Sequence, residues 1–163
     1  MILNEPKSLD LHSLNLGNSQ SHKVFVLLFG DHNQNDWSSF DTRYVIIDCL
    51  RAGLPKQTVH NILEKTAVTK MQLSNIIHIS YRQLNRYEAD DKLSAEQSNF
   101  LYEFARLYVR TTDILGDAST ADGWLHRPNA ALRGKNPIEI LDTIEGFRMV
   151  EDLLSQIEYG FYS

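Results

Sequence analysis

Apolar residues recur every three or four positions through most of the chain after residue 40. This spacing puts them on one face of a helix, so it predicts amphipathic helices that pack around a common core. We expect helices over residues 41–52, 55–64, 69–77, 80–88, 94–115, 118–126 and 143–158. The pattern therefore indicates an all-α fold.

The first 40 residues follow a different pattern. Residues 1–22 are polar apart from spaced leucines, and they predict a flexible arm or a short pairing segment. The apolar run Val24–Phe29 predicts a short buried strand or an apolar hook, and a polar loop follows it over residues 30–35. We therefore expect residues 1–40 to form an N-terminal extension.

Residues with short polar side chains mark the starts of several helices, because their oxygens can accept the free backbone N–H groups there. Two of these predicted caps, Thr69 and Ser80, lie close together. A short helical pattern and the turn His78-Ile79 separate them. The segment 69–88 therefore predicts a helix-turn-helix. The predicted caps are Thr69, Ser80, Ser94 and Asn136.

The second helix of this pair carries polar side chains that suit DNA. Arginine can donate two hydrogen bonds to guanine, asparagine and glutamine can pair with adenine, and lysine or serine can contact phosphates. In a helix-turn-helix this second helix enters the major groove. The alternative is an ordinary helix pair with a solvated polar face. The residues that we expect to contact DNA are Lys70, Ser80, Tyr81, Arg82, Gln83, Asn85 and Arg86.

Charge is distributed unevenly along the chain. The formal net charge is −5, which argues against a simple nucleic-acid binder. Residues 56–88 nevertheless hold five basic and two acidic side chains, whereas residues 117–163 hold four basic and eight acidic ones. A basic segment within an acidic protein fits a local phosphate-binding face. A chance excess of a few charges is the alternative.

Signals for catalysis, metal binding or membrane insertion are weak. Cys49 is the only cysteine, and its apolar helical position favours a buried thiol over a nucleophile. The six histidines include no pair at ligand spacing on one helix, and no glycine-rich phosphate loop occurs. We expect no catalytic residue, no metal site and no cofactor. The short apolar stretches and the lack of a signal-peptide pattern predict a cytoplasmic protein without membrane contact.

The end of the chain is rich in aromatic residues. Tyr159, Phe161 and Tyr162 surround Gly160, although chain ends are usually polar. Aromatic side chains concentrate in the buried centres of interfaces, which favours contact with a partner protein. The alternative is that these side chains fold back onto the last helix and complete the core.

The C-terminal third contains an ordered set of residues. It comprises Trp124-Leu125, the run PNAALRGKNPIEILDT at 128–143, Gly146, Val150–Leu154 and Ile157–Gly160. This set resembles the toxin-binding domain of the Xre/MbcA/ParS antitoxin family. Upstream, Gly53-Leu54-Pro55, the helix pair at 69–88 and Leu93–Ser98 resemble the Xre-like N-terminal domain of that family. The resemblance covers residues 42–163, and it departs from many relatives at Gln83, where they have threonine.

The resemblance implies a non-catalytic antitoxin of a type II toxin–antitoxin system. Its helix-turn-helix domain would span residues 41–116 and its toxin-binding domain residues 117–163. The implied partner is a RES-type toxin that consumes NAD, whose active-site entrance the C-terminal domain blocks. The implied toxin-facing residues are Arg148, Glu151, Glu158, Tyr159, Gly160, Phe161, Tyr162 and Ser163, and the implied scaffold residues are Trp124, Leu125, Pro128, Leu132, Pro137 and Leu141.

Family members of this kind often repress their own operon, so operator DNA is a second implied partner. Because operators are usually palindromic, we also expect a homodimer within the complex with the toxin. The alternative to an antitoxin is a stand-alone helix-turn-helix transcriptional regulator that has no toxin partner.

Overall fold

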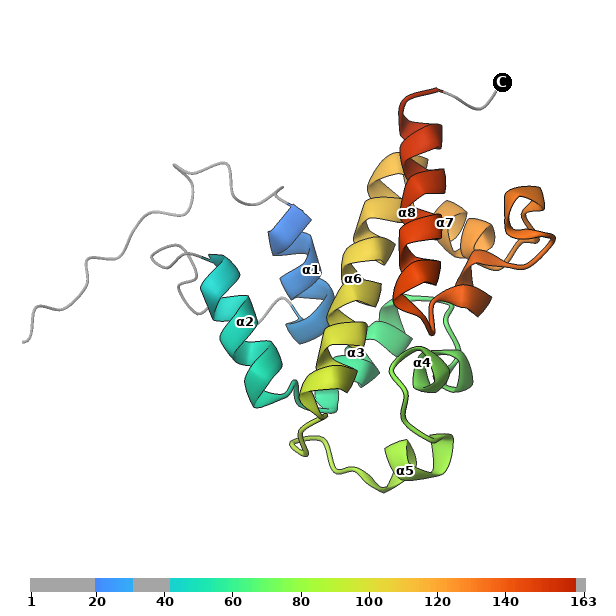
Figure 1. Ribbon diagram of the computed structural model, residues 1–163. Coiled ribbons are helices and arrows are strands. Elements are labelled where there is room, and N and C mark those ends of the chain that lie inside the picture. The colour runs from blue at the N-terminus through green and yellow to red at the C-terminus, as the bar shows by residue number, and fades with distance from the viewer. Residues whose placement is uncertain (1–19, 31–41, 161–163) are drawn as a thin grey trace, which may run out of the picture.

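The computed structural model describes residues 20–30 and 42–160, and within these ranges the protein is all-α (Figure 1). Residues 1–19 of the expected arm, residues 31–35 of the expected loop and residues 161–163 of the aromatic end lie outside the described residues, whereas residues 20–22 of the arm belong to α1. None of the described helices is long and apolar enough to cross a membrane. The helices are α1 Gln20–Phe29, α2 Thr42–Ala52, α3 Gln57–Lys65, α4 Lys70–Ile76, α5 Tyr81–Arg86, α6 Ala95–Leu115, α7 Ala118–Leu125 and α8 Ile144–Glu158, with the 3-10 turns η3 Ala130–Leu132 and η4 Pro137–Ile140 before α8.

The apolar run over 24–29 lies in helix α1, so the prediction of a strand or hook is wrong. Val24, Leu27 and Leu28 are buried at helical spacing, and α1 packs against α3 and α6. A run in which every position is apolar fits a strand or a buried helix equally well, and only the packing partners decide between them. The helix ends at Gly30, whose φ of 79° suits glycine.

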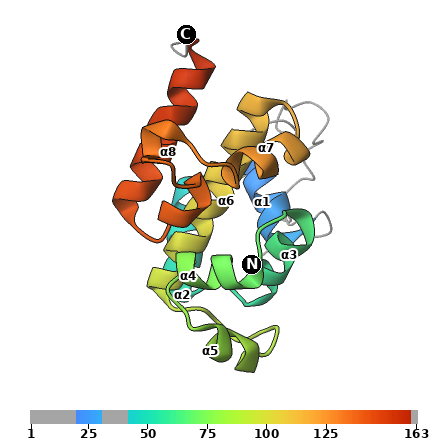
Figure 2. The same ribbon diagram turned by 90° about the vertical axis from the view of Figure 1, so that its right-hand side faces the viewer.

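Helix α6 forms the centre of the molecule, and α1, α2, α7 and α8 all pack on it (Figures 1 and 2). Ser94 caps it as predicted, and the Gln97 side chain accepts a bond from the Ser94 backbone N–H in return. Leu101 and Phe104 are among the fully buried side chains of its inner face. One continuous core therefore joins the N-terminal and C-terminal helices around α6.

The turn between α2 and α3 is fixed against the start of α6. Gly53 has a φ of 89°, and a Cβ there would lie 2.3 Å from the carbonyl oxygen of Leu93, so no other residue fits without movement. The next backbone N–H, that of Leu54, donates to the buried Ser98 hydroxyl at 2.8 Å. Tyr44 and Ile47 on α2 are 68% and 39% exposed.

The C-terminal helix α8 lies along α6. Phe147, Val150 and Leu154 are buried between the two helices. Thr143 caps α8 by accepting the Gly146 N–H at 3.0 Å. A Cβ at Gly146 would lie 1.6 Å from the carbonyl oxygen of Ile140, so the absence of a side chain allows α8 to start directly against η4.

Candidate functional site: a helix-turn-helix and an exposed C-terminal helix

The helix-turn-helix predicted at residues 69–88 is formed by α4 and α5. Thr69 caps α4, with its hydroxyl accepting the Gln72 N–H at 3.2 Å and the Gln72 side chain accepting the Thr69 N–H at 2.9 Å. Ser80 caps α5 by accepting the Gln83 N–H at 3.0 Å. The turn between them contains His78 with a φ of 58°, a left-handed conformation that is uncommon outside glycine.

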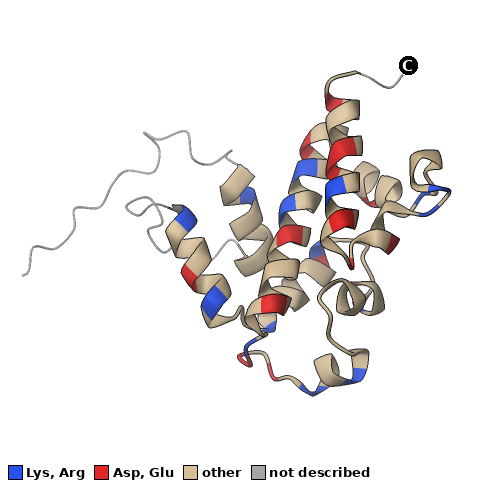
Figure 3. Cartoon of the chain, viewed as in Figure 1, with Lys and Arg blue, Asp and Glu red and all other residues tan. Residues whose placement is uncertain are grey.

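Helix α5 contributes one side chain to the core, because Leu84 is its only buried residue. The side chains predicted to contact DNA therefore point outward, and α5 lies at one end of the molecule, away from α8 (Figure 1). Figure 3 shows basic residues on α5 at this end. Six of the seven predicted DNA-contacting residues lie on the exposed surface, and they are Ser80, Tyr81, Arg82, Gln83, Asn85 and Arg86.

The seventh, Lys70, is half-buried and has partners within the protein. Its Nζ donates a hydrogen bond to Asn85 Oδ1 and lies 5.6 Å from the centre of the Tyr81 ring. The structure thus brings Lys70 of α4 together with two residues of α5. All three were predicted to contact DNA, but the spacing of residues in the sequence does not reveal this contact across the turn.

The turn of the helix-turn-helix is bonded to the C-terminal part of the chain. The Nε2 atom of His78 lies 2.6 Å from the carbonyl oxygen of Asp142, so this nitrogen carries the proton and donates. The His78 ring packs on Phe100 of α6 at 4.4 Å between centroids, and Phe100 in turn contacts Phe147 of α8. These contacts offset the cost of the left-handed turn and fix its orientation relative to α8.

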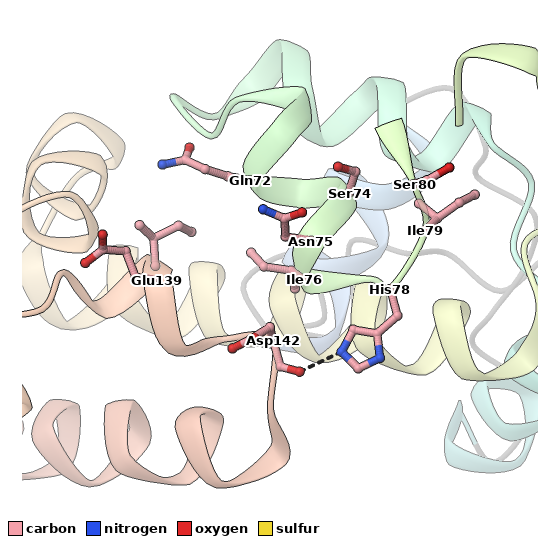
Figure 4. Close-up of a pocket in the computed structure, with 10 residues that line it drawn as sticks. Gln72, Ser74, Asn75, Ile76, His78, Ile79, Ser80, Glu139 and Asp142 are labelled. Atoms are coloured by element: carbon pink, nitrogen blue, oxygen red, sulfur yellow. Dashed lines mark hydrogen bonds between the residues drawn. The ribbon is translucent and has the colours of Figure 1, made fainter. Parts of the chain in front are cut away.

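A cleft of about 460 Å³ lies between the helix-turn-helix and η4 (Figure 4). Its lining includes Ser74 and Ser80, but the Ser74 hydroxyl donates to the Met71 carbonyl and the Ser80 hydroxyl caps α5. The His78 Nε2 in the cleft is bonded to a backbone carbonyl rather than to a hydroxyl. The cleft therefore lacks the nucleophile and base contact that acyl or phosphoryl transfer uses.

Two further features of the described ranges bear on metal binding and on thiol reactivity. Residues 20–30 and 42–160 hold no group of three or more His, Cys, Asp or Glu side chains that could bind a metal ion. Burial, with a smaller contribution from Asp48, raises the pKa of the Cys49 thiol. The reactive thiolate is therefore disfavoured at neutral pH, although Cys49 is half-buried rather than buried as its helical position predicted.

The outer face of α8 is the second candidate surface. The predicted toxin-facing residues Arg148 and Tyr159 are exposed, with Tyr159 at 70%, and Gly160 is also exposed. Ile144 and Met149 on the same helix are 62% and 42% exposed. Ile144 is the first residue of α8.

Two of the predicted toxin-facing residues have partners on α6. Glu151 accepts from Arg106 at 2.8 Å, and Glu158 accepts from Arg110 at 3.2 Å. Arg110 also donates to the Ser155 hydroxyl at 2.8 Å. These contacts fix α8 along α6. Phe161, Tyr162 and Ser163 lie outside the described residues.

Most of the implied scaffold residues of the C-terminal part are in the core. Leu125, Leu132 and Leu141 are at most 4% exposed, and Pro137 is buried. The remaining two differ, because Trp124 is half-buried and Pro128 is exposed at the start of the loop before η3.

Both parts of the chain match known protein families. Residues 48–106 match the antitoxin Xre-like helix-turn-helix domain, and residues 110–160 match the antitoxin Xre/MbcA/ParS C-terminal toxin-binding domain. The first match includes α4 and α5, and the second includes α8. A toxin-binding domain implies a toxin as partner, and a helix-turn-helix domain implies DNA binding.

Two relatives are similar to larger shares of the chain than either family model matches. The chain is 26% identical over 127 residues to the Prs ADP-ribosylating antitoxin of Sphingobium sp. (strain YBL2), a match that covers 72% of this chain and 80% of the relative. It is 28% identical over 100 residues to the antitoxin Xre of Pseudomonas putida (strain KT2440), which covers 61% of this chain and 62% of the relative.

Proposed function

This chain belongs to the Xre/MbcA/ParS family of antitoxins, and from that premise we propose that it neutralises a toxin by covering the toxin's active-site entrance with α8 and the residues that follow it. The observation that carries the proposal is the exposed apolar surface of α8 within the matched toxin-binding domain. Ile144, Met149 and Tyr159 are all more than 40% exposed there. Methionine and aromatic residues are enriched at protein interfaces, where they supply buried contact area.

The packing of α8 supports this role. Its inner face is buried against α6, and the ion pairs of Glu151 and Glu158 fix its position. A helix that is already rigid loses little conformational entropy on binding, so more of the contact energy is available for affinity. A standard interface of roughly 1,600 Å² would suffice for a stable complex.

We further propose that the toxin is of the RES type and consumes NAD. The resemblance of the C-terminal residues to this antitoxin family supports that identity. One relative is named as an ADP-ribosylating antitoxin, and ADP-ribosyl transfer draws its ADP-ribose from NAD. In this proposal the antitoxin itself contributes no catalytic group and acts by keeping NAD out of the toxin's cleft.

Co-expression with the product of the neighbouring reading frame tests neutralisation. We expect Met149→Asp and deletion of residues 159–163 each to reduce protection of growth and to restore NAD loss in cells carrying the toxin. Ser119→Asp on the exposed surface of α7 is the matched control, and it should protect like the parent. Full protection by both the truncated chain and Met149→Asp would show that this face does not bind the toxin.

We also propose that the helix-turn-helix represses the operon that encodes the chain, as a homodimer on a palindromic operator. The exposed side chains of Arg82 and Arg86 support contact with DNA. In a gel-shift at matched salt, Arg82→Ala and Arg86→Ala should weaken binding, whereas Arg133→Ala in the C-terminal loop should not. Equal binding by all variants would show that α5 is not the helix that contacts DNA.

A further inference from the structure

Lys70 and Asn85 together present hydrogen-bond donors. We propose that this pair makes α5 bind guanine in preference to adenine at the base that Asn85 contacts. The inference rests on the proposed binding of DNA by α4 and α5. It assigns Lys70 a role in specificity, whereas the sequence pattern predicted only a phosphate contact.

The contact fixes which way the Asn85 amide faces. Lys70 Nζ donates to Asn85 Oδ1 across the turn, over a separation of 15 residues in sequence. An ammonium group has only donors, so the amide oxygen must face it. The Nδ2 group of Asn85 is then directed to other partners, and both of its N–H donors are left for DNA.

The position of Lys70 on its own helix supports a role outside that helix. Lys70 is the first residue of α4, where the partial positive charge of the helix terminus disfavours a cation. Thr69 and Gln72 already satisfy the capping contacts of this helix. The side chain instead extends to α5, where the Tyr81 ring lies 5.6 Å from its Nζ and Asn85 accepts its hydrogen bond.

The chemistry of the base edges then determines the preference. Adenine presents one donor and one acceptor in the major groove, so asparagine recognises it with its oxygen and its nitrogen together. Guanine presents two acceptors, O6 and N7. Asn85 with its oxygen bonded to Lys70 offers N–H groups to such an edge, and the ammonium has two further donors beside them. The pair therefore matches guanine.

Selection from a randomised DNA duplex library tests the proposal. The full chain and its Asn85→Ala, Lys70→Met and Lys135→Met variants are selected at one fixed salt concentration. Asn85→Ala should abolish the base preference at one position of the selected sequence. We expect the parent to prefer guanine by roughly tenfold at that position. Lys70→Met frees the amide oxygen and should change that preference to adenine. Lys135→Met removes a charge from the C-terminal loop and should select the parental sequence.

The outcomes separate this proposal from the DNA binding on which it rests. If Lys70→Met weakens binding equally for all sequences and leaves the preferred base unchanged, Lys70 is a phosphate contact and the proposal is wrong. The proposal would also be overturned if the parent selected adenine at the position that depends on Asn85. Selection of the parental sequence by Asn85→Ala would overturn it as well. Failure of the parent to enrich any sequence would refute DNA recognition itself.

Discussion

Helices α5 and α8 carry the two proposed partner surfaces, and they are held in place in different ways. Helix α5 has six residues and buries only Leu84. Helix α8 has 15 residues, buries five of them and forms ion pairs with α6. A helix as short as α5 is not stable by itself in water, so its conformation depends on the turn and cap that precede it.

The positions of the two surfaces therefore depend on different parts of the protein. The orientation of α5 depends on few contacts, chiefly the Ser80 side-chain cap, the buried Leu84 and the left-handed turn at His78, which is bonded to Asp142. The orientation of α8 depends on the core and therefore on the stability of the whole fold. Local opening should thus occur at lower free energy in α5 than in α8.

The largest expected effect is on α8, from Gly146→Ala. The new Cβ would lie 1.6 Å from the Ile140 carbonyl oxygen, so α8 must separate from η4. We expect a loss of about 4 kcal/mol in the free energy of unfolding, measured by urea denaturation. Gly123→Ala in α7 is the control, because no atom lies within 4 Å of its Cβ position, and it should stabilise by roughly 0.5–1 kcal/mol. Similar stability of the two variants would contradict the close contact at Gly146.

The next effect tests α5 through its one buried side chain. Leu84 is fully buried, and Leu84→Ala should cost about 3 kcal/mol by leaving a cavity under α5. Hydrogen exchange should speed up most in α5 and its turn and least in α8. If amide protection instead fell uniformly, α5 and α8 would belong to one cooperative unit, and α5 would not open at a lower free energy than α8.

The helix boundaries could largely be predicted from the sequence because their signals are local. The caps at Thr69, Ser80 and Ser94 all form the predicted hydrogen bonds. Each depends only on a short polar side chain and on backbone N–H groups within three residues. The family of the chain was likewise identified from an ordered run of residues, and the comparisons confirm it.

Contacts between distant residues could not be predicted in this way. The apolar run over 24–29 was assigned to a strand or hook because its pattern does not reveal that α3 and α6 surround it. The bond from Lys70 to Asn85 and the packing of His78 on Phe100 depend on the geometry of the folded turn. The exposed Met149 could have been noticed, because it lies between the inward-facing Phe147 and Val150 and out of phase with both.

A smaller effect tests how α5 depends on its cap. Ser80→Ala removes the acceptor of the Gln83 N–H and should cost about 1 kcal/mol. Because the loss is local, we expect weaker DNA binding with unchanged binding of the toxin. Ser119→Ala on the exposed start of α7 should change neither. Equal loss of both activities in Ser80→Ala would show that the cap stabilises the whole protein rather than α5.

The smallest effect concerns the ion pairs that fix α8. Glu151 is 30% exposed and pairs with Arg106 at 2.8 Å, whereas Glu145 is 72% exposed and pairs with Arg148 on its own helix at 3.3 Å. Glu151→Gln should therefore cost roughly 0.5–1 kcal/mol in urea denaturation at low salt, and Glu145→Gln close to nothing. Salt at about 1 M should reduce the cost of Glu151→Gln only in part, because half-buried charges are screened less strongly than exposed ones. An equal cost for both would mean that the pair with α6 does not hold α8, and that its packed inner face alone keeps the helix in position.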